Sequence, residues 1–203
     1  VSDLRTENLI FWVFLMPESE GNIMSKTLKL VIAALMASMA CVATMVIKIP
    51  IPATGGYINL GDSIVLLSGV VLGPVYGGLA AGLGSALADL LGGYVAFAPA
   101  TFIIKALMAV VTGLIIRTNP QKHIVNFVFA SLISEIIMIL SYFAFEAIIM
   151  GYGLAATGAI PGNAIQGTAG IVIATMLMPI LGKLNLSLLR KDKPAPTRRD
   201  DEQ

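Results

Sequence analysis

Between Ser63 and Ala88 the chain reads SIVLLSGVVLGPVYGGLAAGLGSALA, an apolar stretch that contains no charged residue but six glycines and one proline. It is longer than the roughly 20 residues that a transmembrane helix needs, and Gly73-Pro74 interrupts it near its centre. As one helix it gives the chain an odd number of membrane crossings, whereas as a helical hairpin it gives an even number. This stretch therefore decides the topology.

The composition of the whole chain indicates an integral membrane protein. Of its 203 residues 57% are hydrophobic and 12% are charged, compared with about 25% charged residues in soluble domains. The chain has one cysteine and one histidine, which excludes an internal disulfide and leaves almost nothing for a cysteine- or histidine-based metal site or catalytic triad. We therefore expect no metal, no cofactor, no enzymatic activity and no nucleic-acid partner.

Basic residues distinguish the two topologies. Apolar spans are predicted at residues 28–47, 99–116, 124–150 and 160–181. Basic residues precede the first of these spans, follow the second and follow the last. If residues 63–88 form a hairpin, all three basic segments face the cytoplasm, as the positive-inside rule favours. The sequence thus predicts an all-α membrane protein, a bundle of six transmembrane helices with cytoplasmic N- and C-termini, in a bacterial plasma membrane. An irregular loop is expected after Pro50 and Pro52.

The ends of the chain differ from this membrane region. Residues 1–23 contain a short apolar run among acidic residues, so we expect an N-terminal extension that is interfacial or not native. Residues 24–186 are predicted to form the six-helix membrane domain. Residues 187–203 are predicted to be a basic, polar cytoplasmic tail.

Small residues recur at four-residue spacing in the first span, at Ala33, Ala37 and Cys41, and similar stripes occur in residues 78–88. Such stripes let helix backbones approach closely within a membrane. In the first span they indicate either packing within the bundle or a docking surface for another membrane protein, and both alternatives stay open at this point.

Polar side chains inside the spans are expensive in a membrane and are usually functional. In the six-span topology several of them converge in the outer half of the membrane, where a loop containing Tyr57, Gly61 and Asp62 is predicted to form a lid. The predicted substrate-binding residues are Asn59, Lys105, Glu135, Tyr142, Glu146, Asn163 and Gln166.

Several of these residues have more than one interpretation. Lys105 is expected either to line a pocket or to neutralise buried charge by pairing with Asp89 or Glu146. Glu135 lies deeper and forms either the pocket floor or a neutral carboxyl that bonds across helices. Tyr94 and Phe97 stack on a flat ring or belong to an interfacial aromatic belt, which is the expected role.

Residues 26–186 resemble the S components, the substrate-binding membrane subunits, of energy-coupling factor (ECF) vitamin transporters. The resemblance rests on the order of short motifs along nearly the whole membrane region. These motifs are Ala33-Ala34-Leu-Met-Ala37, Ile49-Pro-Ile-Pro52, Gly55-Gly-Tyr-Ile-Asn-Leu-Gly-Asp62, Leu72-Gly-Pro74, Tyr76-Gly-Gly, Ala88-Asp-Leu-Leu-Gly-Gly-Tyr94, Phe102-Ile-Ile-Lys105, and Pro161-Gly-Asn163 with Gln166. Within the family the chain looks most similar to the hydroxymethylpyrimidine or pyridoxine type.

The resemblance implies a subunit that captures a small vitamin or precursor on the outer face and delivers it inward. Its partners would be a membrane-embedded coupling (T) subunit, docked on the Ala33-Ala37 stripe, and two cytoplasmic ATPases. No Walker motif occurs in the sequence, so the partners would supply the energy. The alternative is a stand-alone proton-coupled secondary transporter of a small polar solute, in which Glu135 and Glu146 would carry protons.

Overall fold

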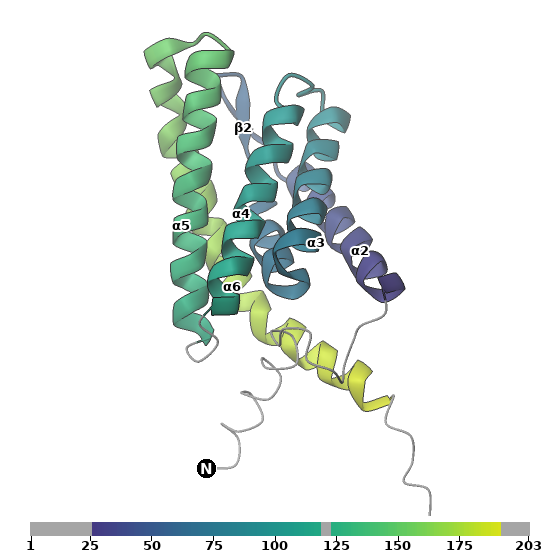
Figure 1. Ribbon diagram of the computed structural model, residues 1–203. Coiled ribbons are helices and arrows are strands. Elements are labelled where there is room, and N and C mark those ends of the chain that lie inside the picture. Colours follow the sequence, from purple (N-terminus) through teal and green to yellow (C-terminus); the bar gives the residue numbers. More distant parts are fainter. Residues whose placement is uncertain (1–25, 119–122, 192–203) are drawn as a thin grey trace, which may run out of the picture.

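The computed structural model describes residues 26–118 and 123–191, and five helices of this part are long and apolar enough to cross a membrane (Figure 1). Two short strands and two short helical segments complete it. In chain order the elements are α2 (Lys26–Val46), β1 (Ile49–Ile51), β2 (Gly56–Ile58), α3 (Asp62–Leu91), α4 (Ala98–Thr118), α5 (His123–Ala144), η1 (Phe145–Ile149), η2 (Gly153–Ala159) and α6 (Ile160–Lys191).

Helix α3 is divided at Gly73, where the predicted break in the glycine-rich stretch is confirmed. The backbone of Gly73 has φ 73° and ψ −178°, a conformation that only glycine adopts without strain. Beyond the break the chain reverses. The evidence is the closeness of Gly77 to Ser68, since a Cβ on Gly77 would lie 2.3 Å from the carbonyl oxygen of Ser68. In a straight helix these two residues would be about 13 Å apart along the axis. The two arms of α3 therefore lie side by side.

The first arm of α3 is the centre of the bundle. All residues from 62 to 70 are buried, as expected for a helix that is apolar on every side. Glycines in both arms of α3 let the backbones of neighbouring helices come into direct contact with it. A Cβ on Gly69 would lie 2.2 Å from the carbonyl oxygen of Ala109 in α4, and one on Gly84 equally close to that of Ala37 in α2.

The segment between α2 and α3 is a small antiparallel β-hairpin, so the prediction of an irregular loop was wrong. Ile49 pairs with Ile58, and Ile51 pairs with Gly56. The turn closes because the carbonyl of Ile51 accepts hydrogen bonds from the backbone N–H groups of Thr54 and Gly55, and Gly55 supplies a φ of +69°. In Figure 1 the hairpin lies away from the end of the bundle at which α2 begins.

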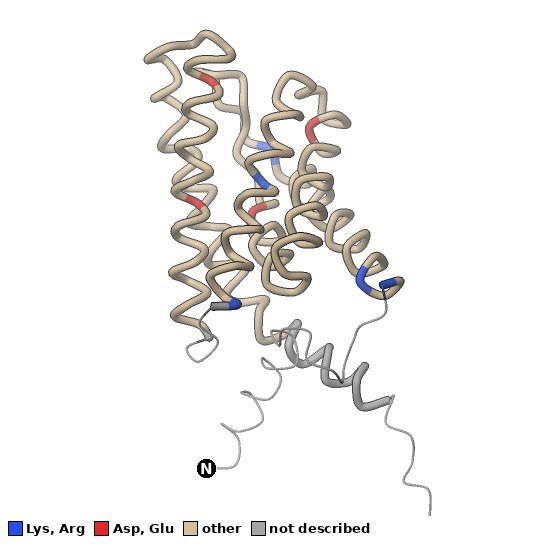
Figure 2. Tube along the Cα trace, in the orientation of Figure 1, with Lys and Arg blue, Asp and Glu red and all other residues tan. Residues whose placement is uncertain are grey.

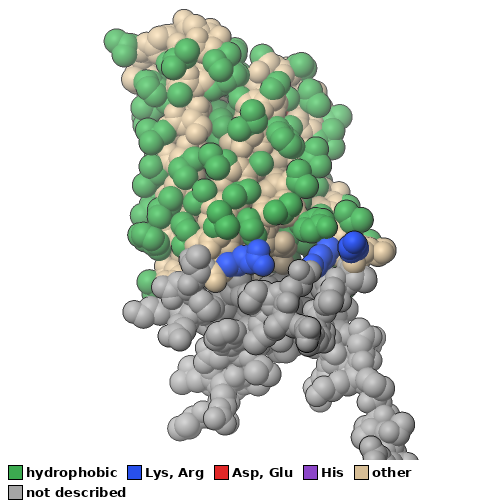
Figure 3. Space-filling view, viewed as in Figure 1, with side chains coloured by type: hydrophobic (Ala, Val, Ile, Leu, Met, Phe, Trp, Pro, Cys, Tyr) green, Lys and Arg blue, Asp and Glu red, His purple; other side chains and the backbone are tan. Residues whose placement is uncertain are grey.

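Charged and apolar side chains are separated on the surface. Lys26, Lys29 and Arg117 lie at one end of the bundle, where α2 begins and α4 ends, whereas the other described lysines lie further into it (Figure 2). Apolar side chains cover the flank above this end (Figure 3). Exposed residues such as Leu35, Leu83 and Ile103 are 57–64% accessible. Lipid accounts for such a surface, because soluble monomers rarely expose large apolar patches.

The predicted terminal segments lie largely beyond the described residues. The N-terminal extension 1–23 lies outside the described residues, as does most of the predicted tail. Helix α6 continues through residue 191, five residues beyond the predicted end of the membrane domain.

Candidate ligand-binding site

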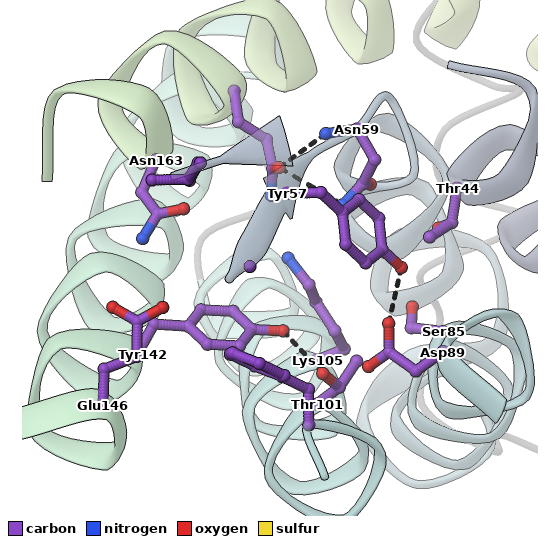
Figure 4. A pocket seen from close by; sticks show the side chains of 14 residues that line it. Thr44, Tyr57, Asn59, Ser85, Asp89, Thr101, Lys105, Tyr142, Glu146 and Asn163 are labelled. Carbon is purple, nitrogen blue, oxygen red and sulfur yellow. Dashed lines mark hydrogen bonds between the residues drawn. The ribbon is translucent and has the colours of Figure 1, made fainter. Parts of the chain in front are cut away.

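The described residues line a partly open pocket between the β-hairpin and helices α2–α6, whose empty space is about 440 Å³ when the open solvent at its mouth is counted (Figure 4). Polar and aromatic side chains dominate its wall. The lining residues are Thr44, Ile51, Gly56, Tyr57, Asn59, Ser85, Asp89, Phe97, Thr101, Lys105, Tyr142, Glu146, Asn163 and Gln166. Because of the reversal at Gly73, Ser85 and Asp89 at the end of α3 return to the level at which α3 begins.

A chain of buried polar contacts joins three helices and the hairpin at the base of the cavity. Lys105 of α4 forms an ion pair with Asp62 in the first turn of α3, and both side chains are almost fully buried. The amide of Gln166 on α6 donates a 2.7 Å hydrogen bond to Asp62. The side-chain carbonyl oxygen of Gln166 accepts hydrogen bonds from the backbone N–H and the side-chain amide of Asn59. These contacts satisfy the buried charges and hold the end of the hairpin on α6.

A second set of contacts holds the hairpin against the end of α3. The Tyr57 hydroxyl donates a 2.5 Å hydrogen bond to Asp89, and its ring lies 4.3 Å from that of Tyr94. The Lys48 ammonium lies 5.0 Å from the Tyr57 ring centroid and 5.4 Å from that of Tyr94. Burial, and then the hydrogen bond to Asp89, raise the pKa of Tyr57, so the hydroxyl keeps the proton that it donates.

Aromatic and hydroxyl side chains complete the wall. The hydroxyls of Thr101 and Tyr142 are 2.9 Å apart, which links α4 to α5. Phe97 packs edge-on against Phe145 with ring centroids 5.6 Å apart. Phe97 is 8% exposed and lines the cavity, so its expected place in an interfacial belt was wrong, whereas Tyr94 packs on Tyr57.

Three oxygen atoms and one side-chain amide around the cavity have no hydrogen-bond partner among the described residues. Asp89 Oδ2, Glu146 Oε2 and the Ser85 hydroxyl are buried atoms without a partner. The side-chain amide of Asn163, which is 6% exposed, also has no hydrogen bond within the described part of the chain. These groups are available to a ligand, whereas the Gln166 amide and one ammonium hydrogen of Lys105 are already engaged.

Six of the seven predicted substrate-binding residues line this cavity, namely Asn59, Lys105, Tyr142, Glu146, Asn163 and Gln166. Glu135 does not line it. Its carboxyl lies beside Gly167 and Gly170 of α6, where a Cβ would be 2.8 Å and 3.2 Å from its oxygens. Neither oxygen of Glu135 has a partner among the described residues. The ion-pair partner of Lys105 is Asp62, where the sequence suggested Asp89 or Glu146.

The predicted lid residues separate in the structure. Tyr57 lines the cavity, whereas Gly61 and Asp62 do not. Gly61 precedes the first turn of α3 and its N–H bonds to Asn59. Asp62 is fully buried, because it neutralises Lys105. A lid role therefore fits only the hairpin.

The predicted docking stripe faces inward for the most part. Ala33 and Ala37 are half-buried against the core, Cys41 is 7% exposed, and Ala37 meets Gly84 at backbone distance. Ala34 and Ser38, which directly follow Ala33 and Ala37 in the sequence, are exposed. Of the two alternatives for the stripe itself, internal packing is the one that these contacts support.

Several lining residues were not predicted from the sequence as site residues. They are Thr44, Ile51, Gly56, Ser85, Asp89, Phe97 and Thr101. A usable signal existed for three of them, because Ser85 and Asp89 stand four residues apart, as do Thr101 and the predicted Lys105, so that each pair shares a helix face. The others depend on the position of the hairpin.

Comparisons with known proteins agree with this architecture. The model of the family "ECF-type riboflavin transporter, S component" matches residues 24–183. A Pyrococcus woesei protein described as "Uncharacterized protein in gap 3'region" is 36% identical over 144 residues, which are 70% of this chain and 93% of that protein. A solved structure described as "Structure and mechanism of the S component of a bacterial ECF transporter" superposes with a TM-score of 0.64 at 21% identity, over 79% of this chain and 99% of the other. The chain is thus a multi-pass membrane protein that belongs to the family of ECF-type riboflavin transporter S components.

Proposed function

We propose that this chain is the substrate-binding subunit of an ECF-type importer and captures a small vitamin or vitamin precursor in the cavity described above. The observation that carries the proposal is the cavity itself. In a chain of the S-component family, five long helices and a hairpin place polar groups without partners around one buried space. Concave sites with a few well-placed polar groups among aromatic side chains are typical of small-molecule recognition.

The proposed orientation has six membrane crossings, both termini in the cytoplasm and the cavity toward the outside. The two arms of α3 count as two crossings in this topology. Lys26 and Lys29 at the start of α2 and Arg117 at the end of α4 lie at one end of the bundle. The reversal at Gly73 is at the same end, since a Cβ there would lie 3.8 Å from the Arg117 guanidinium. The positive-inside rule favours this end in the cytoplasm.

The substrate that we propose is a small polar heterocycle of the hydroxymethylpyrimidine or pyridoxine type. The family description names riboflavin, and the charges around the cavity argue against a strongly anionic vitamin. Lys105 is the only cation among the described lining residues, and Asp62 compensates its charge. A strongly anionic vitamin would need more than one free cation.

Energy would come from partner subunits. Nothing in the sequence resembles a Walker motif, so we propose that a membrane-embedded coupling subunit and two cytoplasmic ATPases drive release. For docking we propose the exposed side of α2, where Ala34 and Ser38 lie between the larger exposed side chains of Val31, Leu35 and Val42. Small residues there would let a partner helix approach closely.

Reconstitution tests this function. The chain should release a small heterocycle on denaturation, identified by mass spectrometry, and proteoliposomes should import that compound only when coupling subunit and ATPases are present. Uptake by the chain alone, driven by a proton gradient, would instead establish the secondary transporter.

A further inference from the structure

A second group of polar atoms lies buried on α5, apart from the cavity. Glu135 and Ser131 are 3% and 0% exposed, and neither lines the cavity. Both carboxyl oxygens of Glu135 and the hydroxyl of Ser131 lack a hydrogen-bond partner among the described residues. Polar atoms withdrawn from water without a partner are unfavourable, and a charged group most of all. An occupant that contacts all three oxygens would remove this cost.

The fold brings these oxygens to one place between α5 and α6. Ser131 and Glu135 are four residues apart and share a helix face. Helical side chains lean toward the N-terminus of their helix, so the Glu135 carboxyl lies over the turn that carries Ser131. Gly167 and Gly170 of α6 face the same carboxyl, because a Cβ on them would lie 2.8 Å and 3.2 Å from its oxygens. The two glycines thus bring the α6 backbone against the carboxyl.

The charges around Glu135 leave one negative charge uncompensated. Asp62 of α3 also packs on Gly170, whose Cβ would lie 2.9 Å from the Asp62 Cβ. One oxygen of Asp62 pairs with Lys105 of α4, and the other accepts a hydrogen bond from Gln166 of α6. Asp62 and Lys105 therefore cancel, and the Glu135 carboxylate has no ion-pair partner among the described residues. One monovalent cation would balance this charge, whereas a divalent cation would leave an excess of positive charge.

A metal cation satisfies this set of atoms better than a proton does. Protonation would neutralise Glu135, but its new O–H group would need an acceptor, and the Ser131 hydroxyl would still have no partner. Oxygen atoms are the ligands that hard cations prefer, so one such ion can contact the carboxylate and the hydroxyl together. The close approach of α6 leaves little room beside the carboxyl, which favours a small ion.

We propose that Glu135 and Ser131 bind a sodium ion between α5 and α6, beside the Asp62–Lys105 pair. The ion neutralises the Glu135 carboxylate and stabilises the packing of α5 against Gly167 and Gly170. This site is separate from the cavity, so the inference does not depend on the proposed function.

Thermal unfolding of the purified full chain in detergent provides the test. Sodium chloride would replace choline chloride stepwise at constant ionic strength and pH. At a sodium concentration about 100-fold above the dissociation constant, we expect the melting temperature to be about 5–10 °C higher than in choline chloride. Potassium chloride should give a smaller shift. Radiolabelled sodium should bind saturably to the same preparation.

Three variants connect the effect to the site. Glu135→Gln should abolish the sodium-dependent shift, and its melting temperature in choline chloride should be no lower than that of the wild type. Ser131→Ala should weaken sodium binding by about tenfold, the equivalent of one lost contact to a charged group. Thr168→Val is the control, since this exposed hydroxyl on α6 bonds to the carbonyl of Ala164. It should leave the shift unchanged.

Three results would overturn the inference. The first is an equal melting temperature in sodium and choline chloride without saturable sodium binding, in which case a proton or water satisfies Glu135. The second is a sodium shift that persists in Glu135→Gln, which would place the ion elsewhere. The third is an equal shift with potassium. If Glu135→Gln fails to fold, labelled sodium binding to Ser131→Ala at wild-type affinity would contradict the site.

Discussion

The amide of Gln166 on α6 donates a 2.7 Å hydrogen bond to Asp62, the residue that also pairs with Lys105 of α4. Asp62 begins a helix arm that is buried throughout residues 62–70. One carboxylate therefore connects α3, α4 and α6 beneath the cavity.

Breaking the Asp62–Lys105 pair on one side should be more harmful than removing both charges. Asp62→Asn and Lys105→Met each leave one buried charge without its partner, and we expect each to lower the free energy of unfolding by about 3–5 kcal/mol. The double variant should lose less than the sum of the two, because no unpaired ion remains. Unfolding in detergent measures this cycle, and additive losses would show that the pair is not coupled.

Asn163 and Gln166 should respond differently to truncation. Asn163 makes no side-chain hydrogen bond within the described residues, so Asn163→Ala should weaken ligand binding by about 1–3 kcal/mol while the melting temperature stays unchanged. Gln166→Ala should also loosen Asn59 and speed amide exchange in β2. Calorimetry and hydrogen-exchange mass spectrometry distinguish the two. Unchanged affinity in Asn163→Ala would remove this residue from the site.

The reversal in α3 predicts that Gly77 cannot be replaced by a larger residue without loss of stability. Gly77→Ala should destabilise the bundle by about 1–3 kcal/mol, because its Cβ would overlap the backbone of Ser68. Gly151→Ala is the control, since its φ of +75° adds backbone strain but no atom lies within 4 Å of its Cβ position. Thermal unfolding of both variants provides the comparison, and a loss no larger at Gly77 than at Gly151 would contradict the close approach of the arms.

Helix α2 offers a matched pair for partner docking. Ala34→Trp should abolish co-purification with the coupling subunit and leave ligand binding intact, because Ala34 is exposed. Ala37→Trp should destabilise the isolated chain, since Ala37 meets Gly84 at backbone distance. A stable Ala37→Trp chain that binds ligand but no partner would return the docking surface to the Ala33-Ala37 stripe.

Glu135 is a buried carboxyl without a hydrogen-bond partner in the described structure. In sodium-free solution Glu135→Met should therefore leave the free energy of unfolding unchanged or raise it by about 1 kcal/mol, because it removes an unsatisfied polar group. Ligand affinity should be unchanged, since Glu135 does not line the cavity. A large loss of affinity in calorimetry would show that Glu135 takes part in binding after all.

Much of the architecture follows from local features of the sequence. Apolar runs of sufficient length predict the membrane helices, and α2 and α4 lie within about two residues of their predicted ends. Gly73-Pro74 predicts the break in α3, because proline lacks a donor and glycine tolerates positive φ. The polar residues within the spans identify five of the lining residues, since a membrane rarely tolerates such groups without a function.

The tertiary structure alone decided which of these polar groups meet. Glu135 and Glu146 are alike in the sequence as glutamates of one apolar span, yet only Glu146 borders the cavity. Asp62 and Asp89 stand at opposite ends of the charge-free stretch, and the fold buries one as the partner of Lys105 and turns the other toward the cavity. The physical reason is that helix rotation and the backbone approach at glycines are set by packing among all helices, whereas hydropathy and helix breaks are properties of the local chain.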